Sequence, residues 1–186
     1  MSYSESRSQI GVRRLLDADW QRLLAVMGRP GRARKWTDAF SPRFAHIVLI
    51  RRAHAFHRSG WRRLGKLTSL LNFGLFGIEV PCSLEIGPGL IIPHTNGIIL
   101  GAARIGSNVT IYQQVTLGAK MADWDYDLTQ RPVVEDGATI AAGAKVLGPV
   151  LLGTNCVIGA NAVVVSNVKP GDVVGGVPAR VLSPGN

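Results

Sequence analysis

His94 is the only histidine between residues 78 and 186, and an acidic residue, Glu79, precedes it by fifteen positions. A solvent-facing imidazole can act as a general base near neutral pH. A carboxylate beside it can hold the imidazole tautomer and stabilise the imidazolium that forms. In a chain that coils with about eighteen residues per turn, the two side chains fall in adjacent coils on nearly the same side. The pair therefore predicts a base and its orienting acid, and the alternative for a lone histidine is a turn residue without a catalytic role.

Such a coil is expected because aliphatic residues recur at every sixth position. A helix would repeat at 3.6 residues and a simple strand at 2. A step of six fits one short strand plus one turn, which predicts parallel strands stacked on themselves rather than an ordinary buried β-rich domain. We expect the aliphatic residues to point inward and the small residues four places later to occupy corners. The aliphatic series are Val134, Ile140, Val146, Leu152, Ile158 and Val164, then Ile99, Ile105, Ile111 and Leu117, then Val80, Ile86 and Ile92; the corner residues are Ala138, Ala144, Val150, Cys156, Ala162 and Val168.

The repeat breaks its own period at two places. The step from Ile92 to Ile99 is seven residues and contains His94, and the step from Leu117 to Val134 is seventeen. We expect an external loop over about 119–132, because no aliphatic ladder can be drawn through it. A stacked coil gains nothing from such interruptions, so both favour a functional site.

The N-terminal segment, residues 1–77, is basic and reads as helical. It carries fifteen Lys and Arg against four Asp and Glu, a net charge of +11, whereas residues 78–186 carry six against eight, a net charge of −2. Apolar spacing predicts helices over 12–27, 44–59 and 61–76. Arginines interleaved with aromatic residues fit either a solvated basic face packed on the coil or contact with an anionic membrane surface. We see no nucleic-acid-binding motif.

The remaining bulk features favour a cytoplasmic protein. No apolar run is long enough to span a bilayer, and the N-terminus lacks the apolar core of a signal peptide. The two cysteines, Cys82 and Cys156, are expected to be reduced thiols within the repeat rather than a disulfide framework. Peripheral contact with the inner membrane face is the extension that the basic segment suggests.

Several segments resemble one family of enzymes. Residues 105–110 (IGSNVT), 158–163 (IGANAV) and 176–181 (GVPARV) resemble hexapeptide-repeat acyltransferases. The stretch from Gly77 to Lys120, followed by residues 141–149 (AAGAKVLGP), looks most like serine acetyltransferases and their shorter relatives in glycan gene clusters. The resemblance implies a mainly β fold, a left-handed parallel β-helix over 78–186 with a C-terminal tail, preceded by the α-helical segment. The left hand comes from the resemblance alone, since parallel crossovers are generally right-handed.

The resemblance also implies a mechanism and its residues. In the family, an acid and a histidine at this spacing form the catalytic dyad, which matches Glu79 and His94, although the acid is usually aspartate. The base takes the proton of an acceptor hydroxyl, which attacks acetyl-CoA directly, and backbone N–H groups near Gly118 would stabilise the oxyanion. Small residues would admit the pantetheine, and two cations would bind phosphate. These cofactor-binding positions are Gly118, Ala119, Ala142, Ala160, Lys145 and Arg180.

The departures from the family pattern bear on the acceptor. The family has aspartate where Pro93 stands, and an Arg-His pair where Gln130 and Arg131 stand. Because those family residues grip serine, their replacement favours a sugar or polysaccharide-precursor hydroxyl, and L-serine is the alternative because Arg131 could still hold a carboxylate. The short N-terminal segment points the same way.

Two other classes of protein compete with an acyltransferase. Some left-handed β-helices are zinc enzymes, which need three histidines at one metal, and this repeat has one, so we expect no metal. A non-enzymatic scaffold would have no use for His94 or the external loop. Since an isolated coil exposes flat faces and strand edges, and since the family builds its sites between three subunits, we expect a homotrimer.

Overall fold

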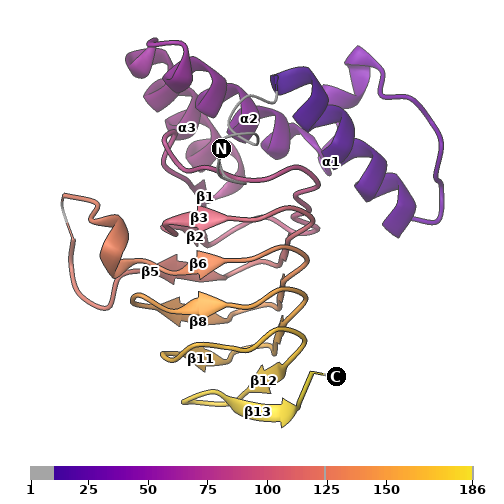
Figure 1. Ribbon diagram of the computed structural model, residues 1–186. Helices are drawn as coiled ribbons and strands as arrows, with labels where there is room; N and C mark the ends of the chain where they lie inside the picture. Colours follow the sequence, from indigo (N-terminus) through magenta and orange to yellow (C-terminus); the bar gives the residue numbers. More distant parts are fainter. Residues whose placement is uncertain (1–10, 124, 186) are drawn as a thin grey trace, which may run out of the picture.

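The computed structural model describes residues 11–123 and 125–185 of the chain. Residues 1–10 of the basic segment, Trp124 of the expected loop and Asn186 lie outside the described residues. Helices gather at one end of the molecule, and short strands stack from there to the C-terminus (Figure 1). The three predicted α-helices are confirmed, and a short 3₁₀ helix that we did not predict precedes the second. The helices are α1 (Val12–Val26), η2 (Trp36–Phe40), α2 (Ala45–Arg58) and α3 (Arg62–Phe76).

The strands form a parallel β-helix with three sheets, as the period of six predicts. Every strand pair is parallel except β12 with β13, which is antiparallel. The first sheet contains β1 (Ile78–Glu79), β2 (Ile98–Leu100), β5 (Thr116–Gly118), β8 (Lys145–Leu147) and β11 (Val163–Val164). The second contains β4 (Thr110–Ile111), β7 (Thr139–Ile140), β10 (Val157–Ile158), β12 (Val173–Gly175) and β13 (Arg180–Ser183). The third contains β3 (Arg104–Ile105), β6 (Val133–Val134) and β9 (Leu151–Leu152).

The strand register locates both breaks of the repeat. Lys145 pairs with Val163, eighteen residues later, which is the regular coil. Glu79 pairs with Ile99, twenty residues later, so the first coil, which contains His94, is two residues longer. Thr116 pairs with Lys145, twenty-nine residues later, because the external loop adds eleven residues between β5 and β6. Figure 1 shows this loop projecting from the side of the stack, as we expected.

The core is the aliphatic ladder, with one exception. Ile105, Ile111 and Leu117 are at most 1% exposed, and the corner residues of the last coils are buried as expected. Ile99 was expected to point inward but is 39% exposed, and Leu100 is fully buried in its place. The first coil takes up two extra residues where we expected one, and the next coil, from Ile99 to Thr116, has only seventeen residues. The inward position of β2 therefore lies one residue later than expected, and a shift of one residue in a strand turns every side chain to the other face.

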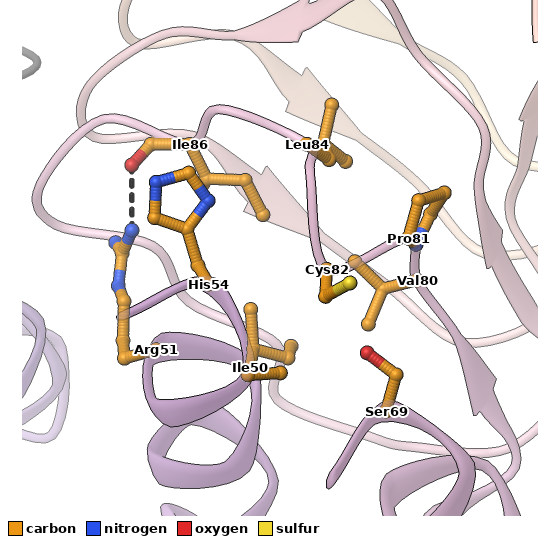
Figure 2. Close-up of a pocket in the computed structure, with 10 residues that line it drawn as sticks. Ile50, Arg51, His54, Ser69, Val80, Pro81, Cys82, Leu84 and Ile86 are labelled. Atoms are coloured by element: carbon orange, nitrogen blue, oxygen red, sulfur yellow. Dashed lines mark hydrogen bonds between the residues drawn. The ribbon is translucent and has the colours of Figure 1, made fainter. Parts of the chain in front are cut away.

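A buried ion pair holds the helices to the first coil. Arg51 of α2 donates from Nε to Asp19 Oδ2 at 2.8 Å and from Nη2 to Asp19 Oδ1 at 2.9 Å. Asp19 of α1 also accepts from the backbone N–H groups of Gly89 and Leu90, each at 2.8 Å. Arg51 reaches the carbonyl of Ile86, the bond drawn in Figure 2. Part of the basic charge of this segment is therefore a structural anchor rather than a solvated face.

Helix α3 buries Gly65 and Asn72 and exposes most of its large apolar residues. Gly65 is buried against α2, where a Cβ would lie 2.9 Å from the carbonyl oxygen of Ala53, so the two helices approach closely. The helix ends at Gly77, whose φ of 63° is the left-handed conformation that favours glycine at this position. Exposed apolar side chains follow the outer surface of the helix: Leu64, Leu67, Leu70, Leu71, Phe73 and Leu75. We call these six residues the outer face of α3.

Candidate active site

The backbone brings the segment of His94 alongside the start of β1. The N–H of Asn96 donates to the carbonyl of Phe76 at 2.9 Å, and the N–H of Ile98 donates to the carbonyl of Gly77 at 3.1 Å. Glu79 is the second residue of β1, and its side chain, like that of His94, is exposed. Within residues 11–123 and 125–185, no hydrogen bond or ion pair joins the two side chains. The backbone therefore places the segment after His94 beside the start of β1, and the pairing of Glu79 with His94 as a catalytic dyad stays a prediction.

A buried histidine that we did not predict holds the backbone next to His94. His46 of α2 is 1% exposed, and its Nε2 lies 3.1 Å from the carbonyl oxygen of Ile92. Burial lowers the pKa of His46 to about 4, although the backbone carbonyls of Ile92 and Pro42 partly oppose that shift. The ring is therefore neutral near pH 7, and its bond to a carbonyl assigns the proton to Nε2. Since Ile92 lies two residues before His94, this bond ties the turn that carries the expected base to the helices.

An open cavity adjoins Glu79. It has a volume of about 310 Å³ and is lined by Ser69, Leu70 and Phe73 of α3 together with Glu79 and Val80. A second cavity, between α2 and the segment from Val80 to Ile86, measures only about 10 Å³, the space of a single water molecule (Figure 2). Of these two, the cavity beside Glu79 is the one with room for an acceptor.

Arg131 and Gln130, the expected acceptor-binding residues, are differently placed. Gln130 is exposed at the end of a short 3₁₀ helix, η3 (Leu128–Gln130). Arg131 is 8% exposed, and its guanidinium is bonded to Asp123 and to the carbonyl of Gly101. All three guanidinium nitrogens of Arg131 thus have partners within the chain.

The expected CoA residues lie on the coils that follow β1. Glu79, Ile99, Thr116 and Lys145 form one row across the outer face of the first sheet. Lys145 stands three strands from Glu79, or about 14 Å at the usual strand spacing, and its Nζ donates to the carbonyl of Gln114.

The other expected CoA positions on these coils are small residues. A Cβ at Gly118 would contact no atom within 4 Å, so open space adjoins this position. Ala142 and Ala160 occupy stacked turns, since the N–H of Asn161 donates to the carbonyl of Ala142 at 2.9 Å. Ala119 follows Gly118 at the start of the external loop. The role of these positions in binding a pantetheine arm stays a prediction.

Arg180 lies near the opposite end of the stack. It begins β13 and lines a cavity of about 160 Å³ with Ser166, Asn167 and Asp172. Its side chain is exposed and donates only to the carbonyl of Ala179 within the described chain. It therefore remains available to an anionic group.

Both cysteines are free thiols, and burial raises the pKa of Cys156 to about 11, which leaves that thiol protonated and unreactive. The described residues form no group of three His, Cys, Asp or Glu side chains that could hold a metal ion.

Comparison with known proteins identifies the chain. Residues 131–166 match the family model described as bacterial transferase hexapeptide (six repeats). The serine acetyltransferase of Mycobacterium tuberculosis is 40% identical over 171 residues, covering 86% of this chain and 73% of the relative. That of Helicobacter pylori is 32% identical over 171 residues, covering 91% of this chain and 98% of the relative.

Solved structures agree with these relatives. A serine acetyltransferase of Neisseria gonorrhoeae in complex with serine has a TM-score of 0.77 at 28% identity, covering 97% of this chain and 73% of that one. A serine acetyltransferase in complex with CoA has a TM-score of 0.79 at 26% identity, covering 96% and 73%. The β-helix is left-handed, and together with the helical segment it defines a hexapeptide-repeat acyltransferase. More narrowly, the chain belongs to the serine acetyltransferase family, which confirms the expected class of enzyme, an O-acetyltransferase.

Proposed function

We propose that this protein is a serine O-acetyltransferase that transfers acetyl from acetyl-CoA to the hydroxyl of L-serine. The observation that carries the proposal is the set of relatives named serine acetyltransferase, at 32–40% identity, over nearly the whole described chain. The comparisons favour this alternative over the sugar acceptor that we first inferred from Pro93, Gln130 and Arg131. The short helical segment is no argument for a sugar either, because this chain covers 98% of the H. pylori relative.

In the proposed reaction, His94 takes the proton of the serine hydroxyl as its oxygen attacks the thioester carbonyl. Glu79 orients the imidazole and stabilises the imidazolium. The tetrahedral oxyanion is stabilised by backbone N–H groups near Gly118. Collapse of this intermediate expels the CoA thiolate, which the imidazolium protonates, leaving O-acetylserine and free CoA.

The test is a comparison of acceptors at saturating acetyl-CoA, following release of the CoA thiol. We expect kcat/KM for L-serine in the ordinary enzyme range, above about 10⁴ M⁻¹ s⁻¹. Free sugars and nucleotide sugars, tested beside it, should be slower by orders of magnitude. A sugar acetylated faster than L-serine would restore the first inference, and no thiol release with any acceptor would favour a scaffold.

We propose further that the protein is a homotrimer. The outer face of α3 is apolar and continues into the cavity beside Glu79, because Leu70 and Phe73 belong to both. A second copy would cover this surface, and contiguous exposed apolar residues of this kind mark interaction sites. Light scattering at micromolar concentration should give about three times the chain mass of 19.9 kDa. A monomer would contradict the trimer.

Among the described helices, none is long and apolar enough to cross a membrane.

A further inference from the structure

The external loop is tied at its base by one arginine. Arg131 donates from Nη2 to Asp123 Oδ2 at 2.7 Å and from Nε to the same oxygen at 3.1 Å. Its Nη1 donates to the carbonyl of Gly101 at 3.1 Å. Both side chains of the ion pair are largely buried, at 9% and 13% exposure. The arginine therefore joins the start of the loop, Asp123, to the coil from which the loop departs.

Tyr126 completes this arrangement. The guanidinium carbon of Arg131 lies 3.6 Å from the centroid of the Tyr126 ring, a close cation–π contact. The hydroxyl of Tyr126 donates to the carbonyl of Ala102 at 3.0 Å. Tyr126 has a φ of 55°, which is uncommon for a residue other than glycine and persists where the surrounding contacts hold it. We call Arg131, Asp123 and Tyr126 the loop clamp.

The loop clamp lies near the expected acid. Gly101 and Ala102, its two anchor points, directly follow β2, and Ile99 of β2 pairs with Glu79. Burial is the largest cause of the raised pKa of Tyr126, Arg131 opposes it, and the charges of Asp123 and Glu79 add to it. Through Ile99, the anchor points of the loop clamp follow the strand that lies directly beside Glu79.

We propose that Arg131 is a positioning residue, which fixes the external loop as a rigid wall of the acceptor site beside Glu79, and is not itself the ligand of the acceptor's carboxylate. The proposal deepens the proposed serine acetyltransferase function and rests on it. Its physical basis is that the guanidinium of Arg131 already has partners at Nε, Nη1 and Nη2, and that its side chain is only 9% exposed. A substrate carboxylate could recruit it only by breaking the pair with Asp123, which would leave a carboxylate largely buried without its partner.

The test compares Arg131→Gln, Asp123→Asn and Tyr126→Phe, with L-serine and L-serinamide as acceptors. Serinamide keeps the hydroxyl and amino groups but lacks the carboxylate. We expect Arg131→Gln and Asp123→Asn to lower kcat/KM by a similar factor, about 10–100-fold, since a displaced wall of about 1 Å costs that much. The loss should affect both acceptors equally and leave KM for acetyl-CoA unchanged. Tyr126→Phe keeps the aromatic ring and should lower kcat/KM by a smaller factor.

Two further measurements separate the loop clamp from other roles. The double variant of Arg131 and Asp123 should lower kcat/KM no more than Arg131→Gln alone, because both substitutions break the same ion pair. Backbone amide hydrogen exchange at Gln130 and Arg131, whose N–H groups bond to the carbonyls of Asp127 and Leu128, should accelerate in both single variants. Arg104→Gln is the matched control, since Arg104 of β3 pairs with Glu135, the residue that follows β6. It should change none of these values.

The outcomes that overturn the proposal are distinct from failure of the proposed function. If Arg131→Gln impairs L-serine alone and Asp123→Asn has no effect, Arg131 binds the substrate carboxylate directly. If amide exchange in the loop is unchanged in both variants, the loop clamp does not hold the loop. If the wild-type protein acetylates neither acceptor, the proposed function fails, while the exchange measurement still decides whether Arg131 fixes the loop.

Discussion

Replacement of His94 with alanine is expected to lower kcat by a factor of about 10²–10⁴, the usual loss when a general base is removed. The serine hydroxyl would then have no group to take its proton during attack on the thioester. Binding of CoA should be unchanged, because the expected CoA positions lie along later coils. The measurements are steady-state kinetics with L-serine and a separate titration of CoA with the inactive variant.

Two further variants make this result specific. Glu79→Gln should lower kcat less than His94→Ala does, because Glu79 orients the imidazole and does not transfer the proton. His57→Ala is a matched control, since His57 is a half-buried histidine whose ring contacts Cys82 at 3.6 Å. It should leave kcat unchanged. If His94→Ala keeps more than half of the wild-type rate, the assignment of His94 as the base is wrong.

Most of the fold could be predicted from the sequence because its repeat is local. An aliphatic residue at each sixth position indicates where a strand must pass through the core, whatever the rest of the chain does. The same holds for the helices, whose apolar spacing placed their ends within one or two residues of those observed. The external loop was predictable for the opposite reason, since no ladder could be drawn through it.

The error at Ile99 shows where this reasoning ends. The first coil holds two extra residues where the sequence indicated one, so the inward position of β2 is one residue later than expected, and only strand pairing reveals this. Ile98 and Leu100 face inward and Ile99 faces out. An aliphatic residue has no polar group that would mark it as exposed, so the three isoleucine and leucine residues of β2 could not be told apart from the sequence.

The candidate site was only partly predictable, because its supporting contacts are long-range. Glu79 and His94 stood out by residue type and spacing. Arg131 stood out as a free cation, but its partners, Asp123 and Tyr126, are set by the folding of the loop. His46 carried no pattern at all, and its role depends on a carbonyl forty-six residues away. The basic composition of the N-terminal segment likewise indicated surface charge, although the fold buries Arg51 against Asp19.

This buried pair leads to the largest expected change in stability. Asp19→Asn should lower the free energy of unfolding by about 3–5 kcal/mol, the typical cost of removing one partner of a buried ion pair. The substitution preserves the shape of the side chain but leaves the charge of Arg51, which is 3% exposed, without its carboxylate. It also weakens the acceptor of the Gly89 and Leu90 N–H groups, where α1 meets the first coil. The measurement is urea unfolding at one fixed protein concentration, because assembly makes stability depend on concentration.

The same helix offers the control for that prediction. Asp17 of α1 pairs with Arg34 at 2.9 Å, but the side chain of Asp17 is 46% exposed. Asp17→Asn removes the same charge two residues away, and exposed pairs contribute only about 0–1 kcal/mol. A large loss at Asp19 with a small loss at Asp17 would show that burial, and not charge alone, makes this contact important. Equal losses at the two positions would contradict the role of the Asp19–Arg51 pair as a structural anchor.

His46 contacts the turn of His94 from α2, the helix that also carries Arg51. Asp19→Asn should therefore also lower kcat at urea concentrations below those that unfold the protein.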